Sequence, residues 1–189
     1  MMWRNLSQGL QRFASGPVTL ASLIIFLVFT AWALPSQAAQ AKAVTGDAGS
    51  PDMSFYYTAK ELYGLAESYG AEGRQAYIRA RFTFDLVWPL VYGFFLCIGI
   101  GWVFRRAFSP GSVWQLANLV PILGVVFDYL ENVSTSLVMG RYPDPTKIVD
   151  SLAAVFTMVK WILVAGSFAL LILGIVAGAL RWVRRRSEP

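Results

Sequence analysis

The sequence contains no histidine and only one cysteine, Cys97, which lies within an apolar run. The lack of histidine excludes a His-ligated metal site and a catalytic triad built on histidine. A single cysteine excludes an internal disulfide and a paired-cysteine redox motif. We therefore expect no metal site and no cofactor, and any catalysis would have to use carboxylates, Lys, Arg, Tyr or Ser/Thr.

Charged residues are also scarce. They make up 14% of the 189 residues, whereas 56% are hydrophobic and the mean hydropathy is +0.52. Soluble domains contain about 25% charged residues, so the excess apolar surface of this chain must be covered by lipid. The composition predicts an integral membrane protein.

The formal net charge of +5 does not indicate nucleic-acid binding, because many of the cations lie at the ends of apolar segments. Arg105 and Arg106 follow one such segment, and the stretch RWVRRR at residues 181–186 follows another. Cations in these positions anchor helices at the membrane surface. The partners that we expect are membrane lipids, and nucleic acid is not among them.

Four segments are long and apolar enough to cross a hydrocarbon core, which needs about 20 helical residues. They are residues 17–34, 82–103, 113–139 and 151–180. The predicted fold class is an all-α integral membrane protein, with these four transmembrane helices in a single multi-pass domain, residues 1–189. The small, polar residues 36–53 predict a flexible linker, and residues 181–189 form a basic tail.

Residues 54–68 predict a short helix outside the membrane, with Ser54 as its N-cap. Aromatic residues are dense here, at Phe55, Tyr56, Tyr57 and Tyr63. Such helices usually lie at the lipid interface, and a lid over a pocket is the alternative.

The distribution of Lys and Arg predicts that both termini are cytoplasmic, in the inner or plasma membrane of a bacterial cell. The cytoplasmic side would then hold eight arginines against one acid, Glu188, and the other side seven cations against seven acids. This is the sign that the positive-inside rule requires. The first segment has an alternative interpretation as a cleavable signal peptide, with Pro35 as a breaker and small residues Ser36 and Ala38 after it.

The third predicted span carries an unusual polar face. Asp128, Glu131 and Asn132 fall on one side of a helix, opposite Val126 and Leu130. Placing one unpaired charged group at the centre of the membrane costs about 2.5–3.5 kcal/mol of insertion free energy even on the lowest scale. We therefore expect these groups to be paired.

The second and fourth spans supply partners for this face. On the second, one side carries the ligand-binding candidates Arg74, Arg81, Asp85 and Tyr92, and the fourth contributes Lys160. Counted from the outer helix ends at about 1.5 Å per residue, the groups from Asp85 to Asp128 lie about 5–16 Å deep, in the outer half of the membrane. We expect Lys160 to pair with Glu131 or Asp128, and Arg81 with Asp85.

These pairings leave one carboxylate in excess. Asp128 is the deepest, and we expect it to hold a proton near neutral pH and to be able to donate or relay it beside Tyr92. Asp128 and Glu131 are therefore the candidate catalytic acid and base. Pro89 and Pro121 each leave a carbonyl one turn earlier unbonded, those of Asp85 and Ala117, which predicts kinks and a hydrated cavity near Asp85.

Three functions remain open at this stage, and whether the chain is an enzyme is undecided. The first is a pocket that binds or modifies a lipid-like or amphiphilic ligand, in which Arg74 and Arg81 hold an anionic headgroup, Asn132 and Tyr92 line the pocket and Lys160 tunes the carboxylates. The second is a non-catalytic membrane subunit or assembly factor whose polar core only fixes helix packing. The third is a proton-coupled carrier, which would require a homo-oligomer through the Gly174/Gly178 face.

Overall fold

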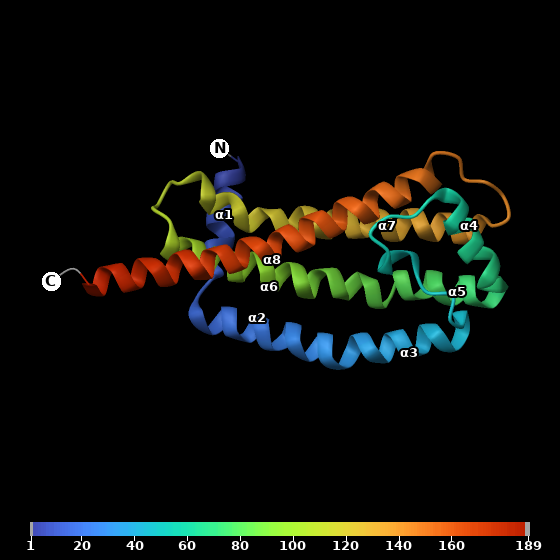
Figure 1. Cartoon of the computed structure of the whole chain (residues 1–189), viewed down its shortest axis with the longest axis horizontal. Coiled ribbons are helices and arrows are strands. Elements are labelled where there is room, and N and C mark those ends of the chain that lie inside the picture. The colour runs from blue at the N-terminus through green and yellow to red at the C-terminus, as the bar shows by residue number, and fades with distance from the viewer. Residues whose placement is uncertain (1, 188–189) are drawn as a thin grey trace. The chain divides into compact units, whose positions relative to one another are not determined.

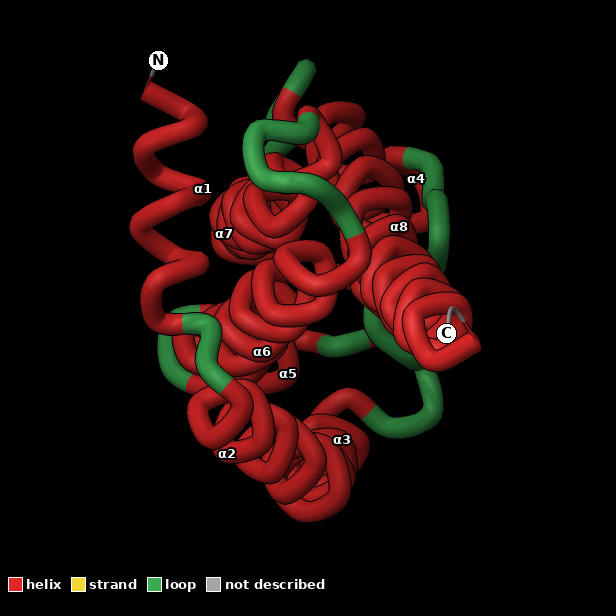
Figure 2. The backbone as a smooth tube through the Cα atoms, turned by 90° about the vertical axis from the view of Figure 1, so that its left-hand side faces the viewer, coloured by secondary structure: helices red, strands yellow, loops and turns green. Residues whose placement is uncertain are grey.

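The structure, a computed structural model, describes residues 2–187. In this range it consists of helices and their connections, with no strand (Figures 1 and 2). The helical segments that are long and apolar enough to cross a membrane are Gly16–Thr45, Gly70–Ala107, Val113–Arg141 and Val149–Arg184. This confirms the prediction of an all-α membrane protein with four transmembrane helices.

The chain divides into two compact units. The first comprises Met1–Phe26, Val91–Gly124 and Ile162–Pro189, and the second Leu27–Leu90 and Val125–Trp161. Three long helices contribute residues to both units: α6 (Phe84–Ala107), α7 (Val120–Arg141) and α8 (Val149–Ser187).

The first span continues past Pro35, which the sequence analysis took as a helix breaker. Helix α2 (Gly16–Val28) passes into a π-helical turn, Phe29–Ala33, and then into α3 (Leu34–Thr45). The amide of Leu34 donates to the carbonyl of Phe29, which closes the π-helical turn. This turn lies directly before Pro35, which has no amide hydrogen to donate. Residues 36–45, expected as part of a flexible linker, are helical, and their alanine-rich composition favours this.

The second apolar helical segment, Gly70–Ala107, is interrupted in its first half. Helix α5 (Gly70–Arg81) ends at a turn of two residues, Phe82 and Thr83, before α6 begins. Pro89 lies inside α6, and the Tyr129 hydroxyl donates to the carbonyl of Leu86 at 2.8 Å. Pro89 has no amide to donate to the carbonyl of Asp85, and the Tyr129 hydroxyl joins α7 to the turn of α6 before this proline.

The third span begins with a 3-10 helix, Val113–Leu119, followed by α7. Pro121 is the second residue of α7, where amides have no helical partner, so it starts the α-helix and does not kink it. The Ala117 carbonyl, which we expected to be free, accepts from the amide of Val120. The predicted kink at Pro121 is wrong because the preceding turn is not α-helical.

The short helix between the first two spans, α4 (Ala59–Ser68), begins later than predicted. Its N-cap is Thr58 and not Ser54: the Thr58 hydroxyl accepts from the Glu61 amide, and the Glu61 carboxylate accepts from the Thr58 amide at 2.7 Å. This reciprocal capping box fixes the start of the helix. The hydrogen bonds from Thr58 lower the pKa of Glu61.

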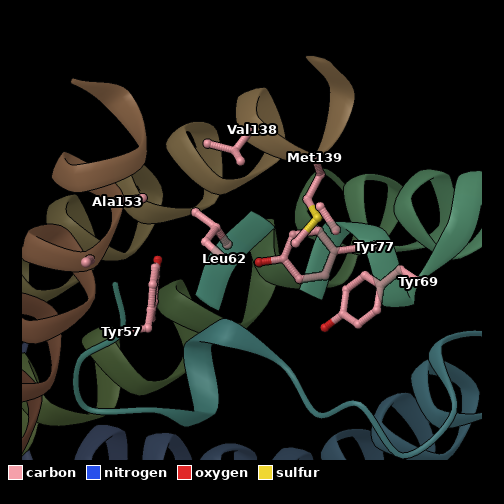
Figure 3. Close-up of a cluster of buried hydrophobic side chains, with 9 residues drawn as sticks. Tyr57, Leu62, Tyr69, Tyr77, Val138, Met139 and Ala153 are labelled. Atoms are coloured by element: carbon pink, nitrogen blue, oxygen red, sulfur yellow. The ribbon is translucent and has the colours of Figure 1, made fainter. Parts of the chain in front are cut away.

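Helix α4 packs into the core of the second unit (Figure 3). Leu62 and Ala66 are fully buried, in a cluster with Tyr77 of α5 and with Val138 and Met139 of α7. The Tyr63 hydroxyl bonds to Thr146 and Asp150, at 3.0 and 3.2 Å. These contacts hold α4 against the end of α7 and the start of α8.

In the first unit, α6 and α8 approach closely at Gly174. A Cβ at Gly174 would lie 2.5 Å from Val103 and 2.6 Å from Phe104, whereas a Cβ at Gly178 would meet nothing within 4 Å. Gly174 is thus used for packing inside the chain. The homo-oligomer remains a prediction, and Gly178 is the part of the predicted face that is open to a partner.

Candidate functional site

The second unit contains a buried cluster of charged side chains centred on Arg81, the last residue of α5. Its Nη1 lies 3.1 Å from Asp85 Oδ2, an ion pair at i,i+4 that spans the turn between α5 and α6. The guanidinium also lies over the ring of Tyr77, 4.5 Å from its centroid. The predicted pairing of Arg81 with Asp85 is therefore present in the structure.

A second ion pair joins α7 to α8. Lys160 Nζ lies 2.5 Å from Glu131 Oε2, and the two side chains are 8% and 1% exposed. The other carboxylate oxygen, Oε1, is buried and has no hydrogen-bond partner among the described residues 2–187. Both charges have lost most of their hydration, so removing either side chain would leave the other as an unpaired buried charge.

Asn132 connects Arg81 to Asp128. Its Nδ2 donates to Asp128 Oδ1 at 3.2 Å, and its Oδ1 accepts from Arg81 Nη1 at 3.5 Å. Asp128 and Asn132 are one turn apart on α7 and are both buried. The amide can serve both neighbours because it is a donor at one end and an acceptor at the other.

The structure adds a charged residue that sequence reasoning missed, Asp52. It lies in a short 3-10 helix, Pro51–Met53, within the segment Gly46–Thr58, which we call the Asp52 loop. Asp52 Oδ2 is 3.2 Å from Arg81 Nη1, and its backbone carbonyl accepts from Trp161 Nε1 at 3.1 Å. The Ser50 hydroxyl donates to the same carboxylate.

The surroundings of Asp52 favour an anion. Burial alone would raise the pKa of this carboxyl, but the charges of Arg81 and Lys160 and the hydrogen bond from Ser50 outweigh it and lower the pKa to about 2. The side chain is nevertheless only 24% exposed. The ion pair with Arg81 and the hydrogen bond from Ser50 therefore hold Asp52 as an anion.

Two tyrosines fasten the Asp52 loop. The Thr157 hydroxyl donates to the Tyr57 hydroxyl at 3.1 Å, and the Tyr69 hydroxyl donates to the carbonyl of Gly49. Burial raises the pKa of Tyr69 to about 12, and it raises that of Tyr57 further above the ordinary value. Both phenols remain neutral hydrogen-bonding groups over the physiological range.

The contacts of Arg74, one of the predicted site residues, lie outside this cluster. Arg74 donates to the carbonyl of Ala66 at 2.8 Å and lies over the ring of Tyr142, 4.7 Å from its centroid. It helps to pack α5 and is not brought to Arg81. Tyr92 is buried in the first unit, and its place beside Asp128 remains a prediction.

The assembled cluster contains more acids than cations. The carboxylates are those of Asp52, Asp85, Asp128 and Glu131, and the cations are Arg81 and Lys160. Among the described residues, no group of three or more His, Cys, Asp or Glu side chains is arranged to hold a metal ion. The chemistry that the arrangement permits is anion binding at the Asp52 position and proton exchange at the carboxylates.

Acid titration should reveal the Asp52–Arg81 pair. The native pKa of about 2 lies below the ordinary value of 3.8, so the pair stabilises the fold above pH 4, and this contribution of about 2 kcal/mol is lost as the pH falls toward 2. The measurement is the free energy of unfolding in detergent between about pH 4 and pH 2. Over this range we expect it to fall by about 2 kcal/mol less in Asp52→Asn than in the unmodified protein. Asp47→Asn, at an exposed acid nearby, should behave like the unmodified protein, and equal acid sensitivity of the two variants would contradict the assignment.

Sequence reasoning missed Asp52 because its partners are distant in the chain. Arg81 lies 29 residues away and Trp161 lies 109 residues away, and no local pattern connects them. Two features did indicate an ordered loop: Pro51, which restricts the backbone, and the aromatic run from Phe55 to Tyr57, which is unusual for a flexible linker.

Comparisons with protein-family models, with curated proteins and with solved structures found no match to this chain.

Proposed function

We propose that the charge cluster of the second unit binds the anionic headgroup of a lipid-like or amphiphilic ligand, and that the Asp52 carboxylate occupies the headgroup position when no ligand is bound. The observation that carries this proposal is a carboxylate, supplied by a connecting loop, that lies 3.2 Å from Arg81 Nη1. A ligand carboxylate or phosphate can replace Asp52 when the loop moves, because Arg81 then lacks this partner.

The residues divide into distinct roles under this proposal. Arg81 binds the headgroup, and Asp85 orients Arg81 through the ion pair across the turn. Lys160 contributes positive charge from the side of α8, while Glu131 keeps it in place. Asn132 and Asp128 line the α7 side of the site. Asp128 and Glu131 remain the candidate acid and base should the ligand also be modified.

The exposed side chains of the Asp52 loop favour an amphiphile over a small soluble anion. Met53, Phe55 and Tyr56 are 80%, 59% and 56% exposed, although they flank a buried charged residue. Apolar and aromatic groups of this kind partition into the lipid interface or contact an acyl chain. The ligand would then enter from the membrane, with its headgroup toward Arg81.

Palmitate, a carboxylate amphiphile, is a suitable probe. We expect Asp52→Asn to raise the amount of palmitate retained on the detergent-solubilised protein about tenfold, since the competing carboxylate is gone, and Arg81→Gln to lower it by a similar factor. Retention can be measured by native mass spectrometry over a titration of the fatty acid.

The matched control is Asp47→Asn. Asp47 lies on the same loop, but its carboxylate is 87% exposed and pairs with Lys42 outside the cluster. Palmitate retention by Asp52→Asn no higher than by Asp47→Asn would contradict exchange at the Asp52 position. Arg81→Lys keeps the charge and serves as the folding control for Arg81→Gln, and thermal unfolding is recorded for every variant.

The proposal competes with a purely structural function for the cluster, as in a membrane subunit or assembly factor. That alternative predicts that Asp52→Asn and Arg81→Gln lower the thermal stability and leave palmitate retention unchanged. Each charged side chain discussed above has a partner inside the chain, which is the observation that favours it.

Proton binding is a second candidate, favoured by four carboxylates against two cations and by the unbonded Oε1 of Glu131. A carrier that uses this site would take up protons in reconstituted vesicles, and Glu131→Gln would abolish the uptake. Vesicles that take up no protons at any pH would exclude it.

We also propose that the protein lies in a cell membrane, the inner or plasma membrane if the cell is bacterial, with both termini cytoplasmic. The distribution of charge supports this orientation: residues 2–26, 91–124 and 162–187, the described part of the first unit, contain eight arginines and no acid.

A further inference from the structure

A cavity of about 250 Å³ lies in the first unit, far in sequence from the Asp52 loop. Its walls come from α1 (Met2–Phe13), from the end of α6 and from the connection between α6 and α7. The polar side chains that line it are Arg4, Ser7, Gln8, Gln11, Arg105, Ser112 and Gln115. Among the described residues 2–187, no acid lines it.

The wall formed by α1 is held by a buried hydrogen-bond network. Ser7 Oγ lies 2.7 Å from Asn118 Oδ1, and Gln11 Nε2 donates to the carbonyl of Gln115 at 2.9 Å. Gln115 in turn donates from Nε2 to the carbonyl of Phe104 at 3.2 Å. Ser7 and Asn118 are each 1% exposed. The cavity is thus built on fixed polar groups, which lowers the cost of ordering a ligand.

Two arginines at the cavity provide its charge. Arg105 donates to the carbonyl of Ala14, which positions its guanidinium beside α1, while Arg4 is exposed on α1 itself. The described part of this unit contains no Asp or Glu, so no carboxylate within it compensates the charge of the two arginines. Guanidinium groups bind phosphate oxygens in pairs, and the field of the surrounding arginines favours an anion here.

Helix α1 also has the features of a helix at a lipid interface. Met2, Trp3, Leu6 and Phe13 lie close together on its helical projection and are 69%, 58%, 44% and 70% exposed. Ser7 and Gln11 lie on the next face, which is the buried one. This arrangement places the cavity at the depth of lipid headgroups when the apolar face enters the membrane.

We propose that this cavity binds a phosphate group, with Arg4 and Arg105 as its cationic ligands and Gln8 and Ser112 as neutral ones. The group is supplied by the headgroup of a phospholipid or by a soluble phosphate. The proposal does not depend on the function of the charge cluster, because it uses other residues in the other unit.

The test compares two single-charge variants on the same helix, Arg4→Gln and Arg12→Gln. Arg4 lines the cavity, whereas Arg12 is also exposed and does not line it. We expect Arg4→Gln to retain about tenfold less phosphatidylglycerol than Arg12→Gln in native mass spectrometry, and Arg105→Gln to act like Arg4→Gln. Diacylglycerol, which lacks the phosphate, is the lipid control, and inorganic phosphate is titrated separately by calorimetry.

The two sources of phosphate give different results. Retention of phosphatidylglycerol that depends on Arg4 assigns the site to a lipid headgroup, and Arg4-dependent heat with inorganic phosphate alone assigns it to a soluble phosphate. An equal loss in Arg4→Gln and Arg12→Gln would overturn the proposal, because attraction to the net charge of the surface would explain it. Diacylglycerol retained as strongly as phosphatidylglycerol, or no binding in either experiment, would also overturn it.

Discussion

Lys160→Met should destabilise the protein by about 3–5 kcal/mol, the largest effect that we expect from a single substitution. The change removes the cation that lies 2.5 Å from Glu131 and leaves a carboxylate, 1% exposed, without its partner. Breaking a buried pair on one side costs far more than the pair contributes in total, since the remaining charge cannot regain its hydration. The measurement is the free energy of unfolding in detergent, from denaturant titration.

The double variant Lys160→Met/Glu131→Leu provides the control. Replacing both members by apolar side chains of similar size removes the stranded charge, so most of the lost stability should return. Lys42→Met, which breaks the exposed pair with Asp47, should change stability by about 0.5 kcal/mol or less. If Lys160→Met proves as mild as Lys42→Met, the Lys160–Glu131 pair is hydrated and the cluster is open to water.

Gly174→Ala should destabilise the protein by about 1–3 kcal/mol through overpacking. The added Cβ would lie 2.5 Å from a methyl carbon of Val103 and 2.6 Å from the ring of Phe104, which is fully buried and has no room to move. A larger residue such as leucine should have a greater effect. Thermal unfolding in detergent, followed by circular dichroism, measures the change.

Gly178→Ala is the matched control, one turn along the same helix. A Cβ there meets nothing within 4 Å, and alanine favours a helix over glycine by about 1 kcal/mol, so stability should stay the same or rise. Equal destabilisation by both variants would contradict close packing at Gly174. If Gly178→Ala instead changes the oligomeric state in detergent, the predicted homo-oligomer uses the open part of this face.

Local sequence patterns were sufficient to predict the framework of the fold. Four apolar segments of adequate length had to be helices, because no other element satisfies its own backbone in lipid. The ion pairs of Lys160 with Glu131 and of Arg81 with Asp85 were also predictable, since charged groups at similar depth in hydrocarbon have few other partners.

Predictions at the helix ends were less accurate, because they depend on hydrogen bonds that composition does not reveal. Pro35 indicated a helix end, yet a π-helical turn before it carries the helix on to Thr45. Pro121 indicated a kink, yet the residues before it form a 3-10 helix, so the proline begins α7. In both cases the local backbone accommodates the missing amide.

The sequence by itself determined the membrane-spanning character of this protein, the polar faces of its helices and the unequal charge of its two ends. All of these follow from residue type and helical period within single segments. Only the tertiary structure decided that Asp52 joins the charge cluster and that Arg74 does not, and only it formed the cavity between α1 and the α6–α7 connection. The physical reason is that these features depend on contacts between residues distant in the chain, and no local periodicity specifies which of several available partners a loop or a flexible arginine will meet.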